Sequence, residues 1–252
     1  MNVSEGELTS MTRDLDEIHH ATLPALRASV SEWVTTRRGF LIGAAGVGAA
    51  GLLAACSSSG STSSSGSSAS SSAAAPGQGL TGDLAIAALA AALENTAVLT
   101  YQKGIDAATA GKLGTVPPAV VTFAQTAQRQ HRDHADAWNA ILTGAGKAAI
   151  PPTYGDTTVF TGVVAPAFAR VTDVAGLAGL ALSLENVAAA TYLSGISAAT
   201  IPAAIKTAAT IQPVEMQHAA ILNFVLGTYP VPDSFAKTDG ARTSTDQIGP
   251  IA

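Results

Sequence analysis

The chain has 252 residues and a formal net charge of −5, and only 12% of its residues are charged, against about 25% in a typical soluble domain. The 13 Lys and Arg residues form no basic block, so we expect no nucleic-acid partner. A single cysteine excludes a disulfide-rich scaffold and a cysteine-based zinc or iron–sulfur site. The length is that of one domain or two small ones.

Residues 1–55 have the features of an export signal with a long n-region. Arg37 and Arg38 precede an uncharged run, 40–55, that is rich in Gly and Ala. The run is shorter than the roughly 20 apolar residues that span a bilayer. A basic region, a short apolar region and small residues before a cut are instead typical of an export signal. The arginine pair resembles the twin-arginine signal, and Leu-Ala-Ala-Cys at 53–56 resembles a bacterial lipobox.

This resemblance implies use of the twin-arginine export machinery, cleavage before Cys56, lipidation of its thiol and attachment to a membrane. We therefore expect an exported lipoprotein of the cell envelope, on the outer face of the cytoplasmic membrane or in the periplasm. The alternative is an uncleaved single-pass anchor with a membrane-buried thiol. We assign no site to His19 or His20, because a cleaved segment cannot serve the mature protein.

The segment that follows the cysteine predicts a flexible tether. Residues 57–79 contain mostly Ser, Gly and Ala, and no hydrophobic residue larger than Ala, so nothing in them can drive folding. A Gly/Ser-rich chain of this length spans roughly 25–30 Å. We therefore divide the remaining chain into a lipidated Cys and tether at 56–79 and a folded domain at 80–252.

The folded domain contains an internal repeat. Residues 93–109 and 184–200 are identical at eleven of seventeen positions, at a constant offset of 91. Each copy precedes a second helical stretch that begins after proline, at 118–143 and 202–227. Short links within the pairs and the long link 144–171 between them predict an all-α four-helix bundle of two duplicated helix pairs joined by a crossover.

Glycines and prolines give three local predictions. Gly104 and Gly195 lie where a left-handed residue would end the first helix of each pair. Pro213 lies inside the last helix and predicts a kink. The tail 228–252 contains two prolines near its start and few large apolar residues, and we expect a coil that covers the bundle or is loose.

The scarce Glu and His residues are concentrated in the repeated helices. Residues 57–252 contain three of each, all in these helices: Glu94, Glu185, Glu215, His131, His134 and His218. Glu94 and Glu185 occupy the same repeat position. His131 and His134 are three residues apart, as are Glu215 and His218, and this spacing places both side chains on one helix face. Burying three unpaired carboxylates costs several kcal/mol each, and a bound pair of metal ions removes that cost.

This arrangement resembles the ferritin-like di-iron carboxylate pattern, in which a Glu on one helix and a Glu-x-x-His on the next occur twice. The resemblance covers residues 80–227. It implies a ferritin-like bundle in which five side chains match ligands of the family: Glu94 and Glu185 as terminal carboxylates, His134 and His218 as histidine ligands, and Glu215 as a bridging carboxylate.

His131 departs from the family pattern, because it stands where the other bridging Glu is expected. Three carboxylates and three imidazoles still offer six ligands to two metal ions, with iron expected first and manganese or zinc as alternatives. The loss of one bridging carboxylate makes the site less negative by one charge, which leaves open whether both metals bind with similar affinity. The alternative is a bundle that keeps the fold and has lost its metal.

Two tyrosines accompany the repeated glutamates. Tyr101 and Tyr192 each lie seven residues after their Glu, on the same helix face. They are candidates for hydrogen bonds to the ligands or for a radical during oxidation. The interpretation we favour is a tyrosine in the core with a satisfied hydroxyl group.

Other polar residues near the candidate ligands have simpler explanations. Four charged residues surround His134 and predict a solvated ionic face: Arg129, Arg132, Asp133 and Asp136. Asn95 and Asn186 are candidates for hydrogen bonds to the ligands, or remnants of the repeat.

The resemblance implies redox chemistry, either oxidation of Fe(II) by dioxygen or peroxide, or removal of peroxide by a dimanganese centre. The sequence shows no base or nucleophile outside the ligand set, so we assign no further catalytic residue. Two alternatives are a protein that binds or stores metal without turnover, and a metal-free structural bundle of the envelope. A homo-oligomer is compatible with the sequence, which leaves the oligomeric state open.

Overall fold

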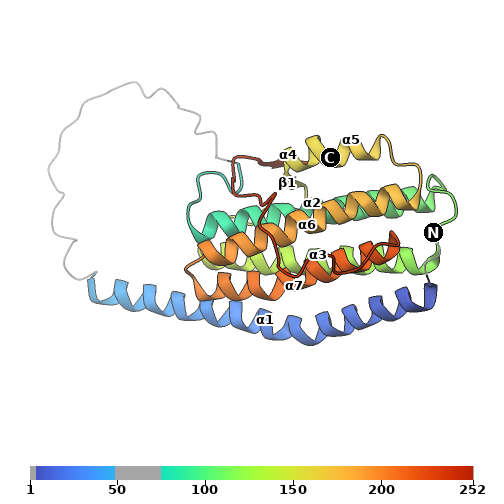
Figure 1. The fold of residues 1–252 in the computed structure, drawn as a ribbon. Coiled ribbons are helices and arrows are strands. Elements are labelled where there is room, and N and C mark those ends of the chain that lie inside the picture. Colours follow the sequence, from blue (N-terminus) through green and yellow to red (C-terminus); the bar gives the residue numbers. More distant parts are fainter. Residues whose placement is uncertain (1–3, 49–74, 252) are drawn as a thin grey trace, which may run out of the picture.

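The computed structural model describes residues 4–48 and 75–251. Four long helices form the bundle: α2 (Asp83–Thr109), α3 (Pro118–Gly144), α6 (Val174–Ala198) and α7 (Pro202–Val225). The most extensive packing joins α2 to α3 and α6 to α7, and the two pairs lie against each other (Figure 1). The prediction of an all-α bundle made of two helix pairs is therefore confirmed.

Prolines and glycines have different roles in these helices. Pro118 and Pro202 each stand in the first turn of a helix, where the missing N–H is not needed. Pro213 lies inside α7, as expected. The prediction that Gly104 and Gly195 end helices was wrong, because α2 and α6 continue beyond them.

The two glycines are instead points of close approach between α2 and α6. A Cβ atom on Gly104 would lie 2.9 Å from the side chain of Leu177 in α6. A Cβ atom on Gly195 would lie 3.4 Å from the side chain of Ile86 in α2. The repeat thus places one glycine of each helix against an aliphatic residue of the other, and close packing requires the glycine at Gly104, whereas the contact at Gly195 is of ordinary length.

The crossover between the pairs contains structure that the sequence did not predict. Its strand β1 (Tyr154–Asp156) is followed by three short helical turns: α4 (Thr157–Val159), the π-helical η1 (Phe160–Val164) and α5 (Ala165–Phe168). Strand β1 pairs antiparallel with β2 (Ile248–Pro250) near the end of the tail. Arg242 Nε lies 2.8 Å from Oδ2 of Asp156. The end of the tail is therefore fixed to the crossover, whereas residues 228–247 are coil, as predicted.

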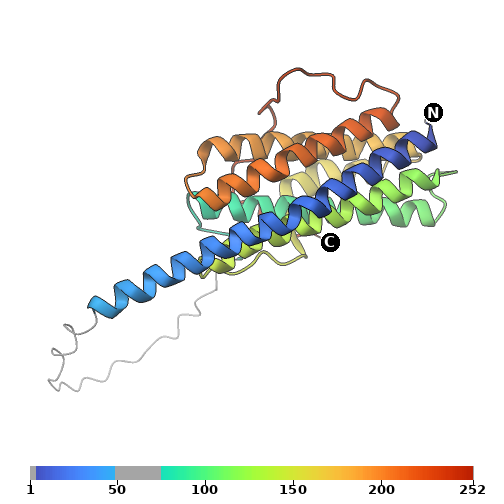
Figure 2. The same ribbon diagram turned by 90° about the horizontal axis from the view of Figure 1, so that it is seen from below.

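A further helix, α1 (Glu5–Gly48), lies along the groove between α3 and α7 (Figure 2). Its buried face is mostly apolar, with Thr12 and His19 among five aliphatic residues: Leu8, Leu15, Leu23, Leu26 and Val30. Each such side chain contributes about 1.5–3 kcal/mol when it is fully buried. The sequence analysis treated this segment as an n-region and did not predict its packing. Arg37 and Arg38 lie within α1, and Cys56 lies outside the described residues.

Ion pairs join α1 to α3. Arg27 Nη2 lies 2.8 Å from Oδ1 of Asp133, and Arg129 Nη2 lies 2.8 Å from Oδ1 of Asp16. The sequence predicted a solvated ionic face around His134. At Asp133 and Arg129 the structure corrects this, because the partners of these charges come from α1. Since exposed ion pairs contribute only about 0–1 kcal/mol, the apolar face accounts for most of the stability of this contact.

Candidate metal centre

The six predicted side chains meet in the middle of the bundle, and every bundle helix contributes at least one of them. Each residue is at most 2% exposed. They form two overlapping groups of four, and the ligand atoms of each group lie within 4.8 Å of one another. The first group is Glu94, His131, His134 and Glu215, and the second is His131, Glu185, Glu215 and His218.

The first group surrounds the end of the centre next to α2 and α3. Oε2 of Glu94 lies 2.7 Å from Nδ1 of His131 and 3.6 Å from Nδ1 of His134. Nδ1 of His134 is also 3.0 Å from Oε1 of Glu215. The packing of α2 on α3 thus brings one carboxylate and two imidazoles close to the carboxylate of Glu215 in α7.

The second group lies next to α6 and α7. Nε2 of His131 is 3.2 Å from Oε1 of Glu185. Nδ1 of His218 is 3.3 Å from Oε2 of Glu185 and 3.6 Å from Oε2 of Glu215. His131 and Glu215 therefore belong to both groups, which places them between the two ends of the centre.

The tyrosines bond to the glutamate of the opposite pair. The hydroxyl of Tyr101 in α2 donates to Oε1 of Glu185 in α6 at 2.5 Å, and the hydroxyl of Tyr192 in α6 donates to Oε1 of Glu94 in α2. Burial and the nearby carboxylate raise the pKa of each tyrosine well above its ordinary value. Each tyrosine is thus both a core residue and a hydrogen-bond donor to a candidate ligand. The sequence analysis had treated these two roles as alternatives.

Gln130 is a site residue that sequence reasoning missed. Its side chain is fully buried, and Oε1 lies 2.8 Å from Nε2 of His218. Because an amide oxygen only accepts, His218 carries a proton on Nε2 and directs Nδ1 to the centre. The only signal in the sequence is a glutamine one position before His131, and it does not identify His218 as the partner of that glutamine.

The charges of the centre are mutually stabilised. Burial alone lowers the pKa of His134, but the charges of Glu94 and Glu215 outweigh burial and raise this pKa to about 9. Burial likewise raises the pKa of Glu94, but His134 and His131 outweigh it and lower this pKa to about 2. The carboxylate of Glu185 raises the pKa of His131 despite burial. Without metal, these imidazoles are therefore positively charged and neutralise the carboxylates at neutral pH.

Several atoms of the centre fit a metal better than they fit one another. Both carboxylate oxygens of Glu215 and Nδ1 of His134 are buried and make no hydrogen bond, although Nδ1 lies 3.0 Å from Oε1 of Glu215. A cavity of about 20 Å³ also touches Glu94, His131 and Glu185, and a volume above about 10–15 Å³ holds a water-sized group. Carboxylate and imidazole donors in this number suit iron, manganese or zinc.

The remaining polar candidates do not reach the centre. The side-chain amide of Asn95 donates to the carbonyl groups of Pro151 and Tyr154 and so holds the crossover, and Asn186 is exposed. His19 of α1 was assigned no site. Its Nε2 lies 3.1 Å from Oδ2 of Asp133, and its ring centre lies 5.6 Å from that of His134. His19 therefore packs against a candidate ligand and is itself paired with Asp133.

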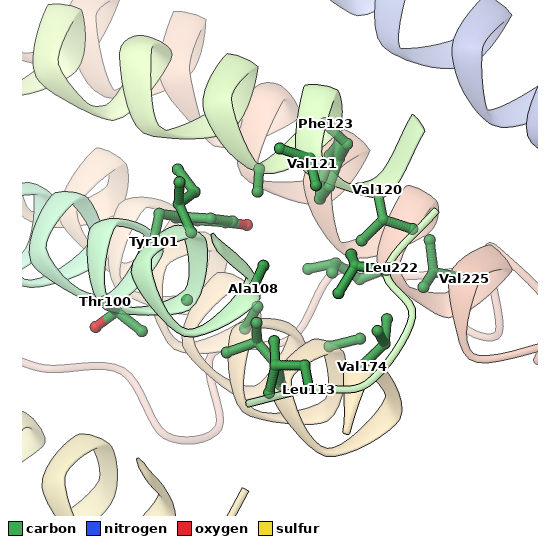
Figure 3. Close-up of a pocket in the computed structure, with 17 residues that line it drawn as sticks. Thr100, Tyr101, Ala108, Leu113, Val120, Val121, Phe123, Val174, Leu222 and Val225 are labelled. Carbon is green, nitrogen blue, oxygen red and sulfur yellow. The ribbon is translucent and has the colours of Figure 1, made fainter. Parts of the chain in front are cut away.

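An apolar cavity of about 50 Å³ lies beside the centre (Figure 3). Its walls come from the second half of α2, the first turns of α3 and α6, and the end of α7. Tyr101 and Phe123 form its inner side. The Tyr101 ring stacks on His131, with 5.5 Å between ring centres. Tyr101 thus separates an apolar space from the candidate ligands.

Comparison with known families agrees with this geometry. Residues 82–228 match the family described as ferritin-like domain. The match covers more than half of the chain and includes all four bundle helices and all six candidate ligands. No curated protein and no solved structure gives a significant match.

Proposed function

We propose, because this chain belongs to the ferritin-like domain family, that its buried carboxylates and imidazoles bind two metal ions and that this centre performs redox chemistry. The observation that carries the proposal is Glu215, which is fully buried and whose two oxygens make no hydrogen bond, although Nδ1 of His134 lies 3.0 Å from Oε1. Leaving buried acceptors unsatisfied is unfavourable, and two cations would satisfy both. Iron is the expected metal, with manganese and zinc as alternatives.

Different residues hold the two ends of such a centre. Glu94 and His134 hold one end, Glu185 and His218 hold the other, and Glu215 lies between them. Gln130 fixes the orientation of His218. Two redox metals in one buried centre supply two electrons, which suits the reduction of dioxygen or of a peroxide bond.

The tyrosines complete the ligand geometry. Tyr192 occupies Oε1 of Glu94, and Oε2 of Glu94 faces His131. Tyr101 occupies Oε1 of Glu185, which also faces His131, and Oε2 of Glu185 faces His218. Outer hydrogen bonds of this kind orient ligands and change metal affinity by about 10–100-fold. We assign these tyrosines to orientation of Glu94 and Glu185.

The apolar cavity beside Tyr101 favours dioxygen over peroxide as the oxidant. Its lining is almost wholly aliphatic and aromatic. Such a space holds a small apolar molecule and offers few hydrogen bonds to a polar one. Peroxide would give up its hydrogen bonds to water on entering this cavity, whereas dioxygen would not.

An iron-oxidation assay tests this function. The full chain, stripped of metal, is loaded anaerobically with Fe(II), and loss of Fe(II) and uptake of oxygen are followed after exposure to dioxygen or peroxide. We expect faster oxidation of Fe(II) than in protein-free buffer, and loss of this acceleration in Glu215→Gln. Asp136→Asn makes the same chemical change at an exposed position of α3 and should leave the rate unchanged.

The outcomes separate the competing functions. Metal that is bound while neither oxidant is consumed would contradict the redox proposal and support storage. A chain that binds no metal would support a structural bundle. If a manganese-loaded chain consumes peroxide alone, peroxide removal would replace iron oxidation as the proposed function.

We also propose that the chain is exported through Arg37 and Arg38 and anchored to a membrane through a lipidated Cys56. The twin-arginine route, whose signal the sequence resembles, exports folded proteins. This agrees with the packing of α1 on the folded bundle. Because α1 ends at Gly48, cleavage before Cys56 would leave this helix attached by non-covalent contacts alone.

Mass spectrometry of the membrane fraction tests export and cleavage together. We expect a membrane-bound chain that begins with a lipidated Cys56. A membrane-bound chain that still contains residues 5–48 would contradict cleavage and make α1 a permanent fifth helix. Replacement of Arg37 and Arg38 by lysine should retain the chain in the cytoplasm, and unchanged export would contradict the twin-arginine route.

A further inference from the structure

His131 presents its two ring nitrogens to two different carboxylates. Nδ1 lies 2.7 Å from Glu94, and Nε2 lies 3.2 Å from Glu185. These carboxylates belong to opposite ends of the centre, since Glu94 neighbours His134 and Glu185 neighbours His218. The ring of His131 therefore lies between the two proposed metal positions and faces each with one nitrogen.

The surroundings of His131 hold the ring in this orientation. The side chain is 1% exposed. The ring centre of Tyr101 lies 5.5 Å away in a stacked arrangement, and that of His218 lies 5.1 Å away. A close-packed interior leaves little space for a different rotamer, so the ring stays between the two carboxylates.

Charge balance gives this position a specific chemistry. The three glutamates carry three negative charges, and two divalent metals carry four positive charges. A histidine that gives up both ring protons carries the missing negative charge, so the buried centre becomes neutral. A fourth glutamate in the family pattern would reach the same sum. Neutrality matters here because a net charge in a buried site is strongly unfavourable.

We propose, on the basis of the dinuclear centre proposed above, that His131 bridges the two metals as an imidazolate. Nδ1 binds the metal held by Glu94 and His134, and Nε2 binds the metal held by Glu185 and His218. Two N–H bonds are replaced by two nitrogen–metal bonds, and the protons pass to solvent.

This bridge predicts a coordination number and a spacing. Each metal has two ligands of its own and shares His131 and Glu215, which gives the four ligands that zinc prefers. Nitrogen–metal bonds of about 2.0–2.1 Å on both sides of one imidazole ring place the metals roughly 6 Å apart. Typical two-metal sites have a spacing of about 3.5–4 Å. The wider spacing distinguishes this centre from one bridged by two carboxylates.

The test uses the full chain loaded with Zn²⁺, with crystals measured on both sides of the zinc absorption edge and metal content determined on the same sample. We expect two zinc ions roughly 6 Å apart with the His131 ring between them. His131→Glu restores the family ligand and should shorten the spacing to about 3.5–4 Å. His131→Gln should weaken binding of the second Zn²⁺ by at least about tenfold.

Each result decides the proposal. Two zinc ions at about 4 Å in the unaltered chain, or a His131 that contacts only one of them, would overturn the bridge and leave the dinuclear centre intact. A single bound zinc would overturn both the bridge and the second metal position. No bound zinc would contradict the proposed function itself. Zinc X-ray absorption in solution is a second readout, because a metal–metal signal at short range should appear in His131→Glu and be absent from the unaltered chain.

Discussion

The two helix pairs of the bundle are built on one repeat and yet contribute different ligands. The pair α2–α3 supplies one carboxylate and two imidazoles, whereas α6–α7 supplies two carboxylates and one imidazole. The difference arises at one repeat position, which His131 occupies in the first pair and Glu215 in the second. The comparison teaches that the scaffold tolerates this exchange because both residues belong to both candidate ligand groups, where either side chain can face both ends of the centre.

Outside that repeat position, the two helix pairs match at several further residues. Tyr101 bonds to the glutamate of α6, and Tyr192 bonds to the glutamate of α2. Gly104 and Gly195 each face an aliphatic residue of the other helix. The predictions below test which of these matched positions are equivalent.

The largest effect is expected from the shared carboxylate. Glu215→Gln removes a ligand from both groups, whereas Glu94→Gln removes a ligand from the first group alone. We therefore expect Glu215→Gln to weaken both metal sites by more than about 100-fold, and Glu94→Gln to weaken one site while the other is retained. Titration of the metal-free chain with Zn²⁺ measures this, and equal losses in the two variants would contradict the shared role of Glu215.

The pH dependence of the metal-free chain tests the charges of His134 and Glu94 in the first pair. The pKa of His134 is about 9 in the folded chain against an ordinary value of 6.5. Its stabilising contribution is therefore complete below pH 6.5 and is lost as pH rises through 9, on the order of a few kcal/mol. The pKa of Glu94 is about 2 against 4.5, so its contribution is lost as pH falls from 4.5 toward 2.

Urea unfolding at several pH values measures this dependence. Stability should be greatest between about pH 4.5 and 6.5 and should fall on both sides of that range. The metal-free His134→Gln chain should show a smaller loss between pH 6.5 and 9. A stability that rises with pH over that interval would contradict a positively charged His134.

The two tyrosines are matched in position but differ in their partners. Removal of the hydroxyl group from Tyr101 takes one hydrogen bond from Glu185, which costs about 1.5–3 kcal/mol for a bond to a charged group. Tyr192 bonds to Glu94 and also accepts the indole N–H of Trp138 at 2.9 Å. Tyr192→Phe should therefore destabilise the chain by about 1 kcal/mol more than Tyr101→Phe. Denaturant unfolding of both metal-free variants measures the difference, and equal costs would mean that the Trp138 contact contributes nothing.

The smallest effect is expected at the glycines. Alanine gains up to about 1 kcal/mol over glycine in a helix interior. A methyl group at Gly195 meets Ile86 at an ordinary contact distance, whereas one at Gly104 crowds Leu177. We expect Gly195→Ala to be neutral or stabilising and Gly104→Ala to be less favourable by about 1 kcal/mol. Thermal unfolding of both variants checks the order, and the reverse order would contradict the packing described here.

Part of this structure could be read from the sequence because its signals are local. The three-residue Glu and His spacings and the prolines at the helix starts lie within single helices, and the repeat is visible by aligning the sequence with itself. They sufficed to predict the bundle and to name the six side chains that meet in it. The departure at His131 was also visible, but no pattern in the sequence shows which residues its two ring nitrogens face.

The contacts that the sequence did not reveal join distant segments. The tyrosine bonds cross between pairs, Gln130 reaches His218 on another helix, and β1 pairs with β2 about ninety residues later. Helix α1 carried an apolar pattern of its own, including Leu8 and Leu15, but the neighbouring arginine pair favoured an export signal as the explanation of the whole segment. A signal and a packed helix can share one segment, and only the structure shows the packing.

The metal content of the full chain tests the central claim most directly. The protein is stripped of metal, equilibrated anaerobically with Fe(II), passed through a desalting column and analysed for iron, with Glu215→Gln treated in parallel. A dinuclear centre predicts about two irons per chain and far less in the variant. Fewer than about one iron per chain, or equal iron in both proteins, would contradict it.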